Sequence, residues 1–150
     1  MKIRVAERSD LPMVTQLVEE FSAEHHWAGR LPFDNVFFMQ GLSDVLGAAG
    51  ILVLLLDDNK GLLVGALGTT AFSAQKIAHE LIWYTRPEAR GYGLLLYEEF
   101  MRWARGQEVE YVFMTLPKAS RAMKRLGFVE AEVGYVRQLQ YNSRYRCRIE

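Results

Sequence analysis

Cysteine is almost absent from this chain of 150 residues, in which Cys147 is the only one. A single cysteine cannot form an internal disulfide, so a disulfide scaffold is excluded and a reducing compartment is the simpler interpretation. The longest apolar run, residues 51–56, is far too short to span a bilayer. The first residues alternate polar and apolar side chains, unlike the apolar core of a signal peptide. We therefore expect a cytoplasmic protein with no membrane partner.

Net charge is also absent, because 18 basic and 18 acidic residues balance. Such a chain has no overall field to attract nucleic acid or an anionic membrane, so any anion site must be local. Near the C-terminus, aromatic and basic residues mix in the way that nucleic-acid binders can, namely Tyr141, Arg144, Tyr145, Arg146 and Arg148. That segment is short. A solvated or partly disordered tail, or a strand exchanged with a second subunit of a homodimer, is favoured over a nucleic-acid partner.

The apolar spacing predicts one mixed α/β domain over residues 1–141, followed by this basic tail at residues 142–150. Helix starts are indicated by Ser9–Asp10 before Pro12 and by Asp34, and a helix end by Gly47. The expected strands are residues 3–5, 51–56, 62–67, 79–85, 110–115, 128–133 and 135–141, and the later helices residues 33–46, 93–105 and 117–126. The order is β-α-α-β-β-β-α-β-α-β-β around one mixed, mostly antiparallel sheet. The runs on either side of the turn at residues 57–61 are apolar throughout, so both faces of that hairpin should be covered.

Residues 85–94 leave a strand, turn sharply and enter a helix. Gly91 and Gly93 permit positive φ and remove the Cβ atoms that would keep a ligand from the backbone. The first N–H groups of the helix lack internal partners and lie at the positive end of its dipole. The segment therefore predicts a backbone anion site without a lysine, the alternative being a tight glycine turn with no ligand. Leu96 stands where a dinucleotide fingerprint needs its third glycine, and no Gly-Lys-Ser/Thr ending marks a P-loop.

These residues resemble the cofactor motif of the GCN5-related N-acetyltransferase (GNAT) superfamily, Arg/Gln-x-x-Gly-x-Gly/Ala. Arg90, Gly91, Tyr92 and Gly93 match it, whereas Leu95 takes the place of its last small residue. That departure narrows the space near the phosphates or shifts the helix. Residues 119–128 resemble the second GNAT signature, a short helix ending in Leu-Gly-Phe. With both motifs in order, the resemblance covers the chain to residue 141. The amino-acid sequence of residues 80–91 also resembles that of acetyltransferases encoded by bacteriophages.

The resemblance implies direct transfer of an acetyl group from acetyl-coenzyme A to an amino group of a small molecule or a protein. It assigns the diphosphate to Arg90, Gly91, Tyr92, Gly93, Leu94 and Leu95, and the pantetheine arm to Trp83, Tyr84 and Thr85. Arg121 and Lys124 are candidates for the 3′-phosphate, although solvated helix charges are the favoured alternative.

Glu80 is the candidate general base. It lies on the strand that leads to the cofactor turn, and strand alternation predicts that it shares a face with Ile82 and Tyr84. Its apolar neighbours should raise the pKa of its carboxyl toward that of a working base. An edge-strand glutamate paired with an arginine is the alternative interpretation.

The general acid is the weak point of the resemblance. Many relatives carry a tyrosine where this chain has Met123, which cannot donate a proton, and Leu116 replaces an asparagine that they carry after the fifth strand. Tyr135 is the candidate substitute, with Tyr92, Ser120, Thr115 and water as alternatives. A coenzyme A-binding or structural module without efficient catalysis is therefore a second hypothesis.

Histidines offer little further chemistry. His25 and His26 are interpreted as lining an acceptor pocket or as exposed loop residues, and His79 as structural. No third ligand stands at a spacing that would make a metal site.

Overall fold

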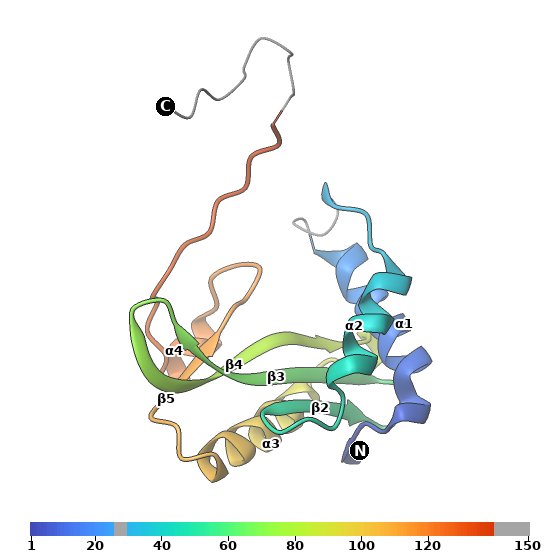
Figure 1. Cartoon of the computed structure of the whole chain (residues 1–150), viewed down its shortest axis with the longest axis horizontal. Coiled ribbons are helices and arrows are strands. Elements are labelled where there is room, and N and C mark those ends of the chain that lie inside the picture. Colours follow the sequence, from blue (N-terminus) through green and yellow to red (C-terminus); the bar gives the residue numbers. More distant parts are fainter. Residues whose placement is uncertain (26–29, 140–150) are drawn as a thin grey trace. The chain divides into compact units, whose positions relative to one another are not determined.

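The computed structural model describes residues 1–25 and 30–139, which divide into two compact units, residues 1–118 and the residues from 119 onward. The first unit holds, in order, β1 (Ile3–Val5), η1 (Arg8–Asp10), α1 (Leu11–Glu24), α2 (Asn35–Val45), β2 (Ile51–Leu56), β3 (Gly61–Thr70), β4 (Ser73–Thr85), η3 (Pro87–Ala89), α3 (Gly93–Gly106) and β5 (Tyr111–Met114) (Figure 1). The second unit contains α4 (Arg121–Arg125).

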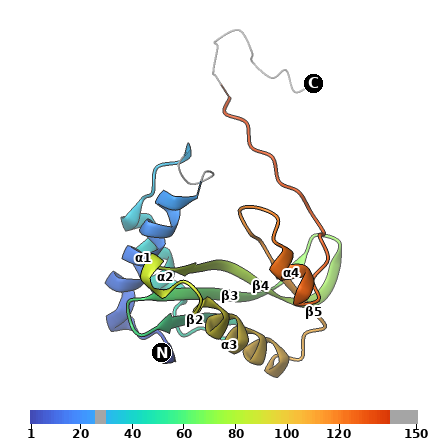
Figure 2. The same cartoon turned by 180° about the vertical axis from the view of Figure 1, so that it is seen from behind.

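The strands form one five-stranded sheet in the order β1-β2-β3-β4-β5. Neighbours from β1 to β4 are antiparallel, whereas β5 runs parallel to β4 after the crossover through α3. Figure 2 shows α3 on the face of the sheet opposite α1 and α2. The predicted mixed α/β class with a mostly antiparallel sheet is confirmed.

Both faces of the sheet bury an apolar core. Val53 and Leu55 of β2 pack in the cluster under α1 and α2, and the alternate residues Leu52, Leu54 and Leu56 pack in the cluster under α3. Strands buried on both faces read as continuous apolar runs, which is why residues 51–56 show no polar alternation. The predicted two-sided cover of the β2–β3 hairpin is confirmed.

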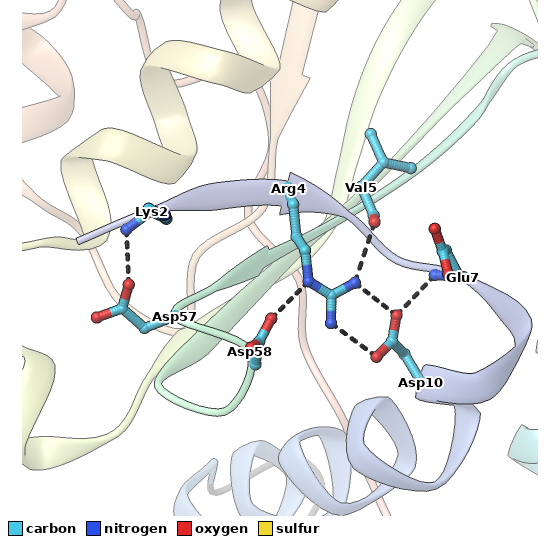
Figure 3. Close-up of polar contacts among 7 residues, drawn as sticks. All are labelled: Lys2, Arg4, Val5, Glu7, Asp10, Asp57 and Asp58. Atoms are coloured by element: carbon cyan, nitrogen blue, oxygen red, sulfur yellow. Dashed lines mark hydrogen bonds and ion pairs between the residues drawn. The ribbon is translucent and has the colours of Figure 1, made fainter.

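The N-terminal strand is fixed by one arginine (Figure 3). The Arg4 guanidinium donates to both carboxylate oxygens of Asp10, at 2.7 and 2.8 Å, and also to Asp58 in the β2–β3 turn. Asp10 additionally accepts from the backbone N–H of Glu7 at 2.7 Å. Its side chain therefore does not cap α1 as the sequence predicted, because the bidentate bond to a charged guanidinium is stronger than a helix cap. Arg4 lowers the pKa of Asp10 to about 2.

The second unit contains less regular secondary structure than the sequence predicts. The expected helix of residues 117–126 is reduced to α4, and residues 128–139 form no strand, so the described chain lacks the predicted terminal hairpin. Gly134 does not adopt the positive φ that a tight turn needs. An isolated two-stranded hairpin is also only marginally stable in water, so its alternating pattern alone does not form it. Residues 140–150, with Cys147 and the basic tail, lie outside the described residues.

In the part of the chain that the structure describes, no helix combines the length and the apolar character needed to cross a membrane.

Candidate functional site

The parallel pairing of β4 with β5 is short and leaves part of β4 open. It joins Ile77–Glu80 to Tyr111–Met114, after which β5 ends and β4 continues to Thr85. Among the described residues, no strand covers this edge of β4 over residues 81–85. Backbone groups on such an edge are free to pair with an extended ligand as if it were an added strand.

A β-bulge lies where this open edge begins. Gly65 of β3 pairs with Glu80 and Val64 pairs with Ile82, so Leu81 is an extra residue on β4. A bulge interrupts the ladder locally and changes the direction of the side chains that follow it. Pairing with β3 resumes at Ile82 and continues to Thr85, whereas pairing with β5 ends at Glu80.

The bulge changes the face on which Glu80 lies. Ala78 packs in the core under α3, whereas Ile82 and Tyr84 pack in the core under α1 and α2. Glu80 lies two residues after Ala78 and therefore points to the same face of the sheet. It pairs with Gly65, where a Cβ atom would clash with the Phe100 ring of α3. The predicted shared face of Glu80 with Ile82 and Tyr84 is therefore wrong, because the inserted residue breaks the two-residue period.

Glu80 is almost fully buried, with 1% of its surface exposed. Its carboxylate accepts a hydrogen bond of 3.2 Å from the backbone N–H of Thr115, the residue after β5. Burial raises the pKa of this carboxyl to about 7, against the smaller opposing effect of that hydrogen bond. No arginine among the described residues forms an ion pair with it. Glu80 is thus a carboxyl that exchanges its proton near neutral pH at the split between β4 and β5.

The cofactor turn follows directly from the open edge. Gly91 has a φ of +102°, a conformation that side chains disfavour, and α3 begins at Gly93. The amides of Tyr92 and Leu95 donate to the carbonyls of Ala89 and Tyr92. In the described part of the chain, the amides of Gly91, Gly93 and Leu94 donate no hydrogen bond. Unpaired amides at a helix N-terminus are the groups that bind phosphate.

Gly93 is packed tightly against side chains of β4. A Cβ atom there would lie 3.3 Å from Cγ2 of Thr85 and 3.4 Å from Nε1 of Trp83. The Trp83 indole donates to the carbonyl of Gly93 at 3.1 Å and its ring stacks on Tyr97. Trp83 and Thr85 therefore hold the start of α3 against β4 with their side chains. The Leu95 side chain also packs toward the core under α3.

The junction between β4 and the turn is tied to α1 by a network that the sequence reading missed. Arg86 donates to both carboxylate oxygens of Glu20 at 2.9 and 2.7 Å, and Arg90 donates to Oε2 of Glu24 at 3.4 Å. The Tyr84 hydroxyl donates to Oε1 of Glu24 at 3.2 Å. The network turns the Tyr84 side chain toward α1 and away from α3. The sequence did contain a signal for this network, because the two glutamates are four residues apart and so are the two arginines.

Neighbouring charges and burial shift the pKa values of three groups in this network. Arg86 lowers the pKa of Glu20 through its hydrogen bonds, and Glu20 in turn raises the pKa of Arg86. Burial, with Glu24 and Glu20 close by, raises the pKa of Tyr84 to about 12. At neutral pH the Glu20–Arg86 pair is therefore fully charged and the Tyr84 phenol is neutral.

The other predicted site residues lie in the second unit or outside the network. Arg121 and Lys124 are exposed on α4, and Tyr135 is 94% exposed. Their assignments to the 3′-phosphate and to the general acid stay predictions. The His25 ring packs on Phe21, and the residue after it, His26, lies outside the described residues. The His79 ring packs edge-on against Phe113, an arrangement that agrees with a structural role.

No family model matches this sequence, and no curated protein matches it either. Solved structures do match the fold. The aminoglycoside 6′-N-acetyltransferase AAC(6′)-IG of Acinetobacter haemolyticus is 16% identical with a TM-score of 0.70, over 95% of this chain and 100% of that one. A GNAT family acetyltransferase of Staphylococcus aureus is 17% identical with a TM-score of 0.63, over 92% and 98%.

A third match is the aminoglycoside acetyltransferase meta-AAC0020 from an uncultured soil sample, solved in complex with sisomicin. It is 18% identical with a TM-score of 0.60, over 93% of this chain and 96% of that one. The chain therefore has the fold of the GNAT acetyltransferases, as its two motifs predicted. The finer resemblance to bacteriophage enzymes gains no support from these comparisons.

Proposed function

We propose that this protein is an acetyl-coenzyme A-dependent N-acetyltransferase that acts on an amino group of a small molecule or a protein. The observation that carries the proposal is the juxtaposition of an open strand edge and a turn with unpaired amides. Both are continuous in the chain, from residue 81 to residue 94, and both lie in a fold shared with structures described as acetyltransferases.

The turn fits a diphosphate. The amides of Gly91, Gly93 and Leu94 are available to its oxygens, and a Cβ atom at Gly91 would meet open space, so the missing side chain there leaves the backbone open to close approach. The edge of β4 over residues 81–85 is available to the amide groups of a pantetheine arm. The coenzyme would supply an activated acyl group as a thioester.

Glu80 is the group that we propose to take the proton from the acceptor amine. A base with a pKa of about 7 is half ionised at neutral pH, which suits general base catalysis. Its position at the start of the open edge is where a thioester paired along β4 would end. Tyr135 stays the proposed proton donor to the leaving thiolate, with water as the alternative.

Thermal denaturation with and without coenzyme A tests the cofactor site. Coenzyme A at about 100 times its dissociation constant should stabilise the fold by about 2.7 kcal/mol and raise Tm by several degrees. Adenosine, which lacks the diphosphate, is the control ligand and should stabilise the fold much less. An unchanged Tm with both coenzyme A and acetyl-coenzyme A would contradict the proposal.

Release of free thiol from acetyl-coenzyme A over a panel of amines tests turnover. For the active amine, Glu80→Gln should lower kcat/KM by about 100-fold or more and remove its rise with pH near 7.

A coenzyme A-binding module without efficient catalysis is the second candidate function. It is favoured by Met123 at the expected position of the acid, and by the burial of Glu80 against Thr115, which serves to fasten β5 to β4. Stabilisation by coenzyme A without thiol release for any amine, or activity that Glu80→Gln leaves unchanged, would select this candidate.

A further inference from the structure

Two carboxylates of α1 hold the start of the cofactor turn, and their two ion pairs differ in strength. The Arg86–Glu20 pair has two short hydrogen bonds, with side chains only 17% and 33% exposed. The Arg90–Glu24 pair has one contact of 3.4 Å, with side chains 64% and 44% exposed. A bidentate, sheltered pair is a lasting anchor, whereas a single exposed contact contributes little and is readily exchanged.

Arg90 lies beside the unpaired amides of the turn. Gly91, which follows it directly, provides the first of these amides, and Gly93 and Leu94 provide the others. A diphosphate bound to them would place negative oxygens next to the Arg90 guanidinium, whose planar donors match phosphate geometry. The same guanidinium now contacts Oε2 of Glu24. With a diphosphate bound, the Arg90 guanidinium would therefore have two anions as possible partners, the diphosphate and the Glu24 carboxylate.

We propose that Arg90 exchanges partners when the coenzyme binds, leaving Glu24 for the diphosphate. This inference rests on the proposed function of the turn and goes beyond it, because it makes Glu24 of α1 a determinant of cofactor affinity. While Nη2 of Arg90 donates to Glu24, that nitrogen is not available to phosphate, so the two anions compete for it. Glu24 itself stays in place after the exchange, since the Tyr84 hydroxyl still donates to its Oε1 at 3.2 Å.

Titration calorimetry with coenzyme A on the full chain tests the exchange in four proteins: the wild type, Glu24→Gln, Arg90→Gln and the double variant. Glu24→Gln frees Arg90 and should tighten binding by about two- to fivefold, the equivalent of one exposed ion pair. Arg90→Gln should weaken binding. In the Arg90→Gln background, Glu24→Gln should have no further effect, because the competition has gone.

Glu19→Gln is the matched control. Glu19 lies on the same helix, is exposed and forms no ion pair among the described residues, so the variant makes the same change in charge without touching Arg90. It should leave the affinity unchanged. Glu20→Gln, which breaks the anchor, should lower Tm and should not tighten binding.

Three results would overturn the exchange. They are equal tightening by Glu19→Gln and Glu24→Gln, an equal effect of Glu24→Gln in both backgrounds, and no tightening by Glu24→Gln at all. The first would indicate a general charge effect and the others a Glu24 that does not compete. If the wild type fails to bind coenzyme A, the proposed function is overturned as well, so the two failures are distinguishable.

Discussion

The Glu80 carboxyl keeps its proton up to an unusually high pH because it is buried in the folded chain. Its pKa is raised from 4.5 to about 7 by burial, so the folded state favours the protonated form. The stability that this preference confers is fully present below pH 4.5. It is lost progressively as the pH rises to about 7, since the unfolded chain ionises first.

Urea denaturation between about pH 5 and pH 8 measures this effect. The unfolding free energy of the wild type should fall by up to about 3 kcal/mol relative to that of Glu80→Gln across this range, as expected for a shift of this size. The variant retains the size of the side chain but cannot ionise, so it removes only this titration. Parallel pH profiles for the two proteins would show that Glu80 is not buried in solution.

Sequence reasoning reached the residue types of the site but not their orientation. The apolar neighbours of Glu80 correctly indicated a raised pKa, and the glycines of the turn correctly indicated open amides. The face of Glu80 was missed, because a bulge depends on how two strands pair and leaves no fixed mark in either strand. The network of Glu20 and Arg86 was missed because it joins residues 66 positions apart.

At the scale of elements, two glycines with opposite environments make a matched pair. A Cβ atom at Gly65 of β3 would lie 2.6 Å from the Phe100 ring, whereas one at Gly41 of α2 would have nothing within 4 Å. Gly65→Ala should therefore force β3 away from α3 and cost about 1–3 kcal/mol of unfolding free energy. Gly41→Ala should instead stabilise α2 by up to about 1 kcal/mol, because alanine is the better helix former.

Chemical denaturation of both variants, with circular dichroism as the readout, checks this difference in sign. Destabilisation by Gly41→Ala would show that α2 is packed differently, and a neutral Gly65→Ala would show the same for the contact between β3 and α3.

Elements with their own end signals were the ones that the sequence placed well. Asp34 caps α2 by accepting from the amide of Phe37 at 2.9 Å, and Gly47 beyond its end has a φ of +84°. β4 begins six residues earlier than predicted, at Ser73 rather than at residue 79, because its first four residues are exposed and carry no alternating apolar pattern. The terminal hairpin had an alternating pattern and Gly134 as its only turn residue, and Gly134 does not adopt a positive φ.

At the scale of the whole chain, the described core belongs to the first unit. Among the described residues, both core clusters and the apolar residues packed against them lie at or before Val112. A fragment of residues 1–118 should therefore fold alone, with a cooperative thermal transition and near-ultraviolet dichroism from Trp83 and Trp103. A fragment without that transition would show that the residues from 119 onward are needed for the core to form.

The overall fold was predictable because each local pattern agreed with one element order. Two apolar runs around a turn, a glycine turn into a helix and a crossover to a parallel strand leave few ways to build a sheet. The acyl acceptor leaves no comparable pattern, since its recognition depends on side chains brought together from separate segments.

The titration of Glu80 also has a calorimetric consequence. A carboxyl with a pKa of about 7 is about half protonated in a neutral solution, so a ligand that alters its burial will take up or release a fraction of a proton. That proton comes from the buffer or goes to it, and the heat of buffer ionisation then adds to the heat of binding. Apparent binding enthalpies at neutral pH should accordingly differ between phosphate and Tris, and the slope against buffer ionisation enthalpy gives the number of protons that move.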